Sequence, residues 1–132
     1  MKIANGDVVT NVGLDVITDR LKFAGVGGVA EPKFVAWGTG TTTPAVTDTT
    51  IETAPGEART DGTSSQQTTD VTDDTYRVVG TITATATRAI TEVGLFTASS
   101  AGSMLVHSVF DVINLTTNDS ITFTLNVDFD NS

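Results

Sequence analysis

His107 is the single imidazole of the chain, and imidazole is the side chain best suited to proton transfer near neutral pH. The residue lies inside an alternating run that predicts a β-strand, with its side chain on the same face as Leu105 and Val109. A lone strand histidine is more often structural than catalytic. A Ser-His-Asp triad assembles only in space, so the sequence leaves it open, but a Gly-x-Ser-x-Gly elbow is missing. We therefore predict that the chain is not an enzyme and has no catalytic residue.

The carboxylates form the second group of residues with possible chemistry. Asp70, Asp73 and Asp74 fall in one predicted turn, and Asp128 and Asp130 lie near the C-terminus. The turn sequence lacks the glycine and the terminal glutamate of an EF-hand loop, and one histidine without cysteine leaves zinc short of its usual ligands. A glycosidase pair would need sugar-stacking aromatics, and the chain has one Trp and one Tyr. We interpret these acids as solvated turn residues and predict no metal site and no cofactor.

Phosphate and lipid partners are disfavoured by the charge of the chain. Its formal net charge is -9, and its seven basic residues do not cluster. The glycines at 25–28 and 38–40 match neither a P-loop nor a G-x-G-x-x-G pattern. We predict no nucleic acid, no membrane and no small-molecule substrate as partner. The first seven residues lack the apolar core of a signal peptide, which predicts assembly in the cytoplasm of the cell that makes the protein.

Most of the elements that must position these residues are predicted strands. The clearest alternation runs over 120–129, with five large apolar residues on one face and Ser, Thr, Asn and Asp on the other. Further strands are predicted over 33–38, 76–88, 89–98 and 103–112. Threonine, the commonest residue, also favours β-structure. We predict a single domain over 1–132: a mostly β, antiparallel sandwich, jelly-roll-like or Greek key, with its core strands within 75–130.

One helix is predicted over 11–24. Leu14, Ile17, Leu21 and Ala24 repeat at helical spacing and form one apolar stripe, and Asn11 is in place to cap the N-terminus. The glycines at 25–28 then end the helix. Its expected role is to cover an open face or end of the sandwich.

The segment 41–70 is polar and has few large apolar residues, so it is not predicted to order as a core element. Two interpretations stand side by side: an extended arm that lies on a neighbouring subunit, and a mobile surface loop. In the first, residues 57–60 and 65–68 would pair as strands once a partner supplies the other edge. Arg59, Thr60 and Gln66 are therefore predicted interface residues.

Two further features are candidates for contact. Trp37 is predicted either to pack in the core or to anchor the chain on a partner, because tryptophan is enriched at interface hot spots. Gly80, Ala84 and Ala86 put small side chains on one face of the predicted strand 76–88, which indicates close approach of another sheet or another chain. In the second case this face would drive homotrimerisation.

Several segments together carry a resemblance to small virion structural proteins of tailed bacteriophages. These are residues 35–40 (VAWGTG), 44–49 (PAVTDT), 88–96 (RAITEVGLF), 102–110 and 118–121 (NDSI). The pattern resembles capsid decoration, or cement, proteins: small β-rich subunits, often trimeric, that bind the outside of the head. The resemblance implies a non-enzymatic protein on the outer capsid surface, with the major capsid protein and its own copies as partners. The alternatives are a tail, baseplate or fibre component and, less favoured, a carbohydrate-binding module, which would need exposed aromatics.

Overall fold

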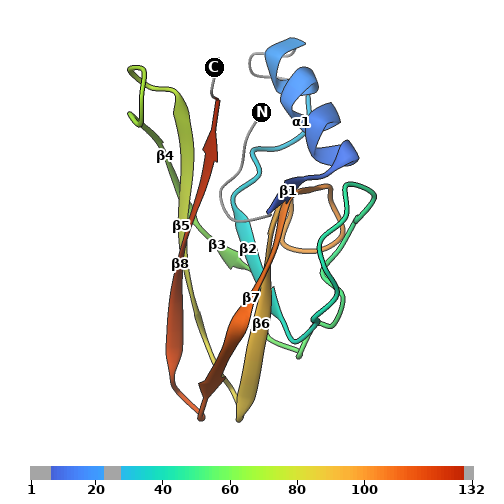
Figure 1. Cartoon of the computed structure of the whole chain (residues 1–132), viewed down its shortest axis with the longest axis vertical. Helices are drawn as coiled ribbons and strands as arrows, with labels where there is room; N and C mark the ends of the chain where they lie inside the picture. Colours follow the sequence, from blue (N-terminus) through green and yellow to red (C-terminus); the bar gives the residue numbers. More distant parts are fainter. Residues whose placement is uncertain (1–6, 23–27, 130–132) are drawn as a thin grey trace.

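Two antiparallel sheets pack face to face, and one helix lies across one end of them (Figure 1). The computed structural model describes residues 7–22 and 28–129, without the side chains of residues 21 and 22. The five-stranded sheet has the order β1-β7-β6-β2-β3, and the three-stranded sheet has the order β4-β5-β8. The predicted antiparallel sandwich with one N-terminal helix is confirmed. The elements are β1 (Val8–Val9), α1 (Asn11–Lys22), β2 (Phe34–Gly38), β3 (Thr60–Asp61), β4 (Thr63–Gln67), β5 (Thr75–Thr83), β6 (Arg88–Phe96), β7 (Met104–Leu115) and β8 (Ser120–Asp128).

The strand β8 follows the alternation that the sequence predicts. Phe123 and Val127 are buried in the sandwich, whereas Thr122 and Thr124 are exposed on the outer face. β8 pairs with β5 over its full length without a break in register. The strand predicted over 76–88 ends early, because residues 84–87 turn from β5 into β6, which belongs to the other sheet. The alternation of small and Thr residues continues through this turn, so the pattern alone did not mark the change of sheet.

The small residues of β5 allow the two sheets to approach each other. A Cβ atom on Gly80 would lie 2.7 Å from Cγ2 of Val35 in the opposite sheet. Ala84 is also buried, and Ala86 is half-buried in the turn. The close approach is therefore between the two sheets of one chain. A trimer contact through Gly80 and Ala84 is wrong as predicted, because both positions are enclosed by the chain's own core.

The helix α1 begins one residue away from the predicted cap. The Oγ1 atom of Thr10, not Asn11, accepts the N–H of Gly13 at 3.0 Å. The same hydroxyl donates to the Met104 carbonyl of β7 at 2.5 Å. This tertiary hydrogen bond favours Thr10 as the cap. The sequence did not distinguish Thr10 from Asn11, because both residue types are good helix caps.

The helix rests on β7 through a side that differs from the predicted stripe. Val16 is 1% exposed and Ile17 is partly buried against the core, but Leu14 is 47% exposed. A Cβ atom on Gly13 would lie 2.6 Å from the Leu105 carbonyl oxygen, so the glycine brings the helix backbone close to the strand. This contact turns the helix toward Gly13 and Val16 and leaves Leu14 outside. The predicted stripe residues Leu21 (its side chain) and Ala24, and the stop glycines 25 and 27, lie outside the described residues.

Candidate functional site

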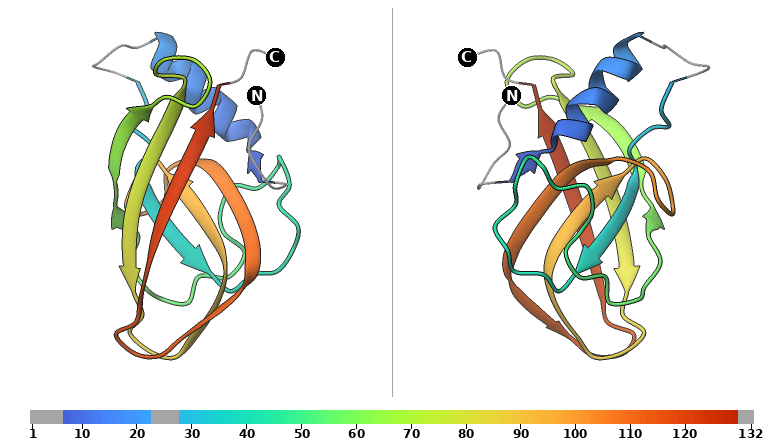
Figure 2. Two further views of the ribbon diagram at one scale, coloured as in Figure 1. Left: turned by 60° about the vertical axis from the view of Figure 1, so that its left-hand side comes forward. Right: turned by 90° about the vertical axis from the view of Figure 1, so that its right-hand side faces the viewer.

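The segment 39–59, which joins β2 to β3 without a strand of its own, lies on the outer face of the five-stranded sheet (Figure 2). Ile51 is buried there with Ala36, Phe96 and Met104, in an apolar cluster separate from the main core. The remainder of the predicted arm 41–70 forms β3, β4 and the turn into β5. The segment therefore packs on the chain's own sheet. The sequence did not reveal this, because a single isoleucine supplies most of its apolar contact.

A buried carboxylate holds this segment in place. Glu92 of β6 is 0% exposed. Its Oε1 accepts the backbone N–H of Gly40 at 2.8 Å and of Thr53 at 2.9 Å, and its Oε2 accepts the N–H of Glu52 at 2.9 Å. The Oε2 atom also lies 3.0 Å from Nε2 of His107. One side chain thus binds the start of the segment and residues 52 and 53 in its second half, and links them to β7.

His107 continues the cluster toward the segment. Its Nδ1 lies 2.7 Å from Oδ2 of Asp48, which also accepts the Ala45 N–H at 2.8 Å. The predicted placement of His107 on the face of Leu105 is wrong, because the register of β6 and β7 shifts at Leu105, between Met104 and Val106. Leu105 packs in the main core, and His107 faces Glu92.

The two carboxylates are stabilised in their charged form. The backbone hydrogen bond from Ala45 lowers the pKa of Asp48; burial opposes this, and the bond to His107 lowers that pKa further. Burial pushes the pKa of Glu92 upward, but the hydrogen bonds from Thr53, Glu52, His107 and Gly40 outweigh it and hold that pKa below its ordinary value. An imidazolium ring donates to both carboxylates at once, whereas a neutral ring donates to one.

This cluster is saturated by contacts within the chain. Both ring nitrogens of His107 and both oxygens of Glu92 have partners, and no buried side-chain nitrogen or oxygen in the described part of the chain lacks one. The same part contains no group of three or more acidic, histidine or cysteine side chains placed to hold a metal ion. The cluster therefore acts as an anchor for the segment 39–59 and offers no open ring nitrogen to a substrate.

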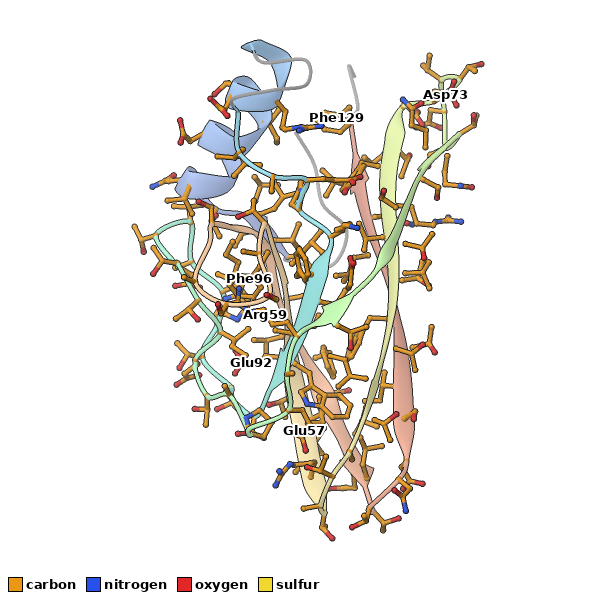
Figure 3. All side chains as sticks on the ribbon, turned by 180° about the vertical axis from the view of Figure 1, so that it is seen from behind. Glu57, Arg59, Asp73, Glu92, Phe96 and Phe129 are labelled. Carbon is orange, nitrogen blue, oxygen red and sulfur yellow. The ribbon has the colours of Figure 1, made fainter. Side chains whose placement is uncertain are left out.

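Glu57 makes a second anchor at the far end of the segment (Figure 3). Its side chain is 3% exposed and lies 3.0 Å from Nε of Arg88, and it accepts the Trp37 Nε1–H at 3.3 Å. It also accepts the Thr85 N–H at 3.1 Å and the Thr85 hydroxyl at 2.7 Å. Burial opposes the charge, but the bonds from Thr85 and Arg88 prevail and lower the pKa of Glu57 to about 2.

Trp37 itself is a core residue. It is 2% exposed, and its ring meets Phe123 edge-on at a centroid distance of 6.4 Å. The interpretation of Trp37 as core packing is confirmed, and that of an exposed anchor on a partner is wrong. The indole Nε1–H of Trp37 can be buried because it donates a hydrogen bond to Glu57.

The remaining predicted interface residues are mostly used within the chain. The Arg59 guanidinium stacks 3.5 Å from the centre of the Phe96 ring and donates to the Ala98 and Ala101 carbonyls at 2.9 and 2.6 Å (Figure 3). Thr60 pairs with Val35. The residues predicted to pair with a partner's strand thus pair with β2 and β5 of their own chain. Gln66 on β4 is the member of this set that stays exposed.

The predicted turn acids have different environments. Asp74 accepts the backbone N–H groups of Thr69, Asp70 and Val71 at 2.7–2.9 Å, and these bonds lower its pKa. Asp73 is exposed and has a φ of 61°, a conformation that aspartate tolerates better than most residues. The acids build the turn, and Asp130 lies outside the described residues.

A cavity of about 510 Å³ opens between α1 and the sandwich. Its wall is mainly apolar, and the Tyr76 hydroxyl at its rim donates to the Pro32 carbonyl at 3.0 Å. Burial, with the nearby charge of Glu31, raises the pKa of Tyr76. The tyrosine is thus held as a neutral hydrogen-bond donor, and its hydroxyl also lies 3.3 Å from Oε1 of Glu31. Its lining residues are Val16, Ile17, Arg20, Glu31, Pro32, Gln66, Asp73, Thr75, Tyr76, Leu105, Val127 and Phe129.

No family model matches the chain, and neither a curated protein nor a solved structure matches it significantly. In the described residues, α1 is too short and polar to cross a membrane. The sequence contained one signal for the buried carboxylates that the sequence analysis did not use. Glu92 is a charged residue inside an otherwise buried strand, and such a residue needs a partner. Asp48 and Glu57 carried no such signal, because they stand among other polar residues.

Proposed function

We propose that this chain is a non-enzymatic structural protein of a tailed-phage particle, assembled in the host cytoplasm, that decorates the outer surface of the head. Its partner would be the major capsid protein, and binding to the expanded shell alone would shift the shell's equilibrium toward that form. The proposal rests on the resemblance of the sequence segments described above.

One structural observation supports a contact-making role in particular. Glu92, His107 and Asp48 are the side chains best suited to proton transfer. All three form hydrogen bonds within the chain that hold the segment 39–59 on the sheet. The outer face of the three-stranded sheet has Thr81 and Thr122 in a hydroxyl pair at 2.7 Å. A surface built from short, β-branched side chains loses little conformational entropy when a partner covers it, which suits a protein that binds by shape.

The other candidate functions have less support. A tail or fibre component would have the same general features, so location on the particle decides between it and head decoration. A carbohydrate-binding module needs exposed aromatic rings, but Trp37 is buried, and Phe129 is the one aromatic among the large, exposed apolar residues described. An enzyme would need an open catalytic group, which the saturated cluster does not provide.

The experiment that tests the proposal is immunogold labelling of intact virions with an antibody against this chain. Label spread over the head is the expected result, followed by loss of thermal stability in expanded heads that lack the protein. Label confined to the tail would overturn the proposal and favour the tail component. Homotrimerisation stays a prediction that native mass measurement would check, but the small residues of β5 no longer provide its contact surface.

A further inference from the structure

The strand β8 leaves one edge without a partner over nine residues. It is the last strand of the sheet β4-β5-β8, and within the described residues no strand pairs with its other side (Figure 2). The other edge strands are much shorter: β1 and β3 have two residues each, and β4 has five. Short edges protect a sheet from pairing with other chains, and β8 lacks this protection.

The hydrogen bonds at both ends of the β5–β8 pair show which residues face the free edge. The Phe129 N–H donates to the Asp74 carbonyl at 3.0 Å, and the Ala84 N–H donates to the Asp119 carbonyl at 2.8 Å. Residues bonded to β5 alternate along an antiparallel strand, so the odd-numbered residues of β8 direct their backbone groups to β5. The backbone N–H and C=O groups of Thr122, Thr124 and Asn126 therefore point outward to the open edge.

In the described residues, this edge lacks three features that natural proteins use to block strand addition: charged side chains, proline and a bulge. Between Asp119 and Asp128 there is no charged residue and no proline. The register with β5 contains no bulge that would twist the edge away. In a chain with a net charge of -9, a charge-free strip of this length is open to close contact with another acidic chain.

The sequence of β8 is complementary to itself in an antiparallel pair centred on Thr124. In that register Thr122 lies opposite Asn126, and Ser120 lies opposite Asp128, so no like charges meet. On the inner face Ile121 would lie opposite Val127, and Phe123 opposite Leu125. Both faces thus pair like with like in polarity, which is the condition for favourable cross-strand contacts.

The opposite sheet supplies a second, independent observation on the same side of the sandwich. Phe110 of β7 packs on Phe123 of β8 at a centroid distance of 6.0 Å, so the two strands lie across from each other. Beyond it, Val112 and Ile113 are 53% and 40% exposed. Within the described residues, β1 covers the outer edge of β7 at Val106 and His107. Two copies joined through β8 would bring their β7 strands toward each other and cover Ile113, which pairs with the buried Ile90 of β6.

We propose that the chain forms a two-fold dimer by antiparallel pairing of β8 with β8 of a second copy, which joins two three-stranded sheets into one six-stranded sheet. The occupant of the edge is a second copy because the strand is self-complementary and because Ile113 of β7 lies on the same side. The inference concerns contact between copies and does not depend on where the chain is located on a particle.

Cysteine cross-linking tests the register directly, since the chain has no cysteine of its own. The Thr124→Cys variant places two thiols opposite each other at the two-fold axis, at a spacing that a disulfide can span. Mild oxidation should convert it to a covalent dimer. Thr63→Cys is the matched control, since Thr63 is an exposed residue of β4 at the other edge of the same sheet and should stay monomeric under the same treatment.

Sedimentation equilibrium of the full chain gives a second readout. We expect the dimer mass to appear with rising concentration and rising salt, because salt screens the repulsion between two acidic chains. Thr124→Lys should raise the dissociation constant by about tenfold or more, whereas Thr63→Lys, with the same change of charge, should leave it unchanged. A monomer or trimer mass at all concentrations, or equal cross-linking of the two cysteine variants, would overturn the proposal.

Discussion

The segment 39–59 and the sheet β4-β5-β8 are both rich in threonine, yet different interactions hold them in place. The segment has no strand. The buried carboxylate of Glu92 binds its backbone, and its own Glu57 binds Arg88 and Thr85 in the rest of the chain. The sheet is held by a continuous ladder of backbone pairs, and its threonines stand on the outer face. Polar composition therefore does not determine whether a stretch is ordered. Order depends on whether its backbone groups find partners in a strand or in a buried side chain.

Removal of the charge at Glu92 should have the largest effect on the stability of the segment 39–59. In Glu92→Gln an amide NH₂ group replaces an oxygen that accepts two hydrogen bonds, so buried N–H groups of the segment lose their acceptor. We expect the free energy of unfolding, measured by urea titration at pH 7, to fall by about 3–4 kcal/mol. Glu52→Gln is the control, since Glu52 is exposed and binds the same segment through Thr41 and Thr42. An equal loss for both variants would contradict the role of burial.

Glu57 should give a smaller effect with a distinct pH dependence. Its pKa is about 2 in the folded chain against an ordinary value of 4.5, so its stabilisation is complete above 4.5 and is lost as the pH falls from about 4.5 toward about 2. Glu57→Gln should lower the free energy of unfolding at pH 7 by about 2–3 kcal/mol. The variant should also show a weaker fall in stability across that window than the unaltered chain. An unchanged pH profile would show that Glu57 is not held in its charged form.

In the sheet β4-β5-β8, substitution of Gly80 tests whether the stability of the sandwich depends on the close approach of its two sheets. The added methyl of Gly80→Ala would lie 2.7 Å from Cγ2 of Val35, whose side chain is fully buried between the sheets. We expect a loss of about 1–2 kcal/mol in the free energy of unfolding. Thr81→Ala, one residue along on the exposed face, is the control. A neutral result for Gly80→Ala would mean that the sheets separate easily.

The smallest effect is expected on the outer face of the same sheet. Thr122→Val removes the hydroxyl pair with Thr81 but keeps the β-branched shape that suits a strand. Because water replaces the lost hydrogen bond at an exposed site, the free energy of unfolding should change by less than about 0.5 kcal/mol. A larger loss would show that side-chain pairs, as well as the backbone ladder, hold this sheet.

Strand type and polarity could be read from the sequence wherever the alternation was long. The alternation predicted over 120–129 is the strand Ser120–Asp128, with Phe123 and Val127 on the buried face as expected, because period-two alternation indicates one solvent-exposed and one buried face. Phe129, at the end of the pattern, lies beyond the strand and is exposed. The boundary between β5 and β6 was missed, since Thr and Ala alternate through the turn. The cap at Thr10 was missed because a hydrogen bond to Met104, far along the chain, distinguishes it from Asn11.

The candidate site was less accessible to sequence reasoning than the fold. The ring of His107 is bound within the chain, but its partners Asp48 and Glu92 are 59 and 15 residues away. The stacking of Arg59 on Phe96 and the burial of Trp37 against Phe123 are likewise contacts between distant segments. No local pattern reports such contacts, because they depend on how the two sheets are folded over each other.

By itself the sequence determined that this chain is an acidic, cysteine-free, mostly β protein with one N-terminal helix, because composition and periodicity act locally along the chain. Tertiary structure alone decided that the small face of β5 meets the chain's own second sheet. It also decided that the polar segment 39–59 packs on the five-stranded sheet, and that no strand of the described residues pairs with the second edge of β8. Each of these depends on which groups from distant parts of the chain meet, and burial and hydrogen-bond satisfaction are properties of that meeting.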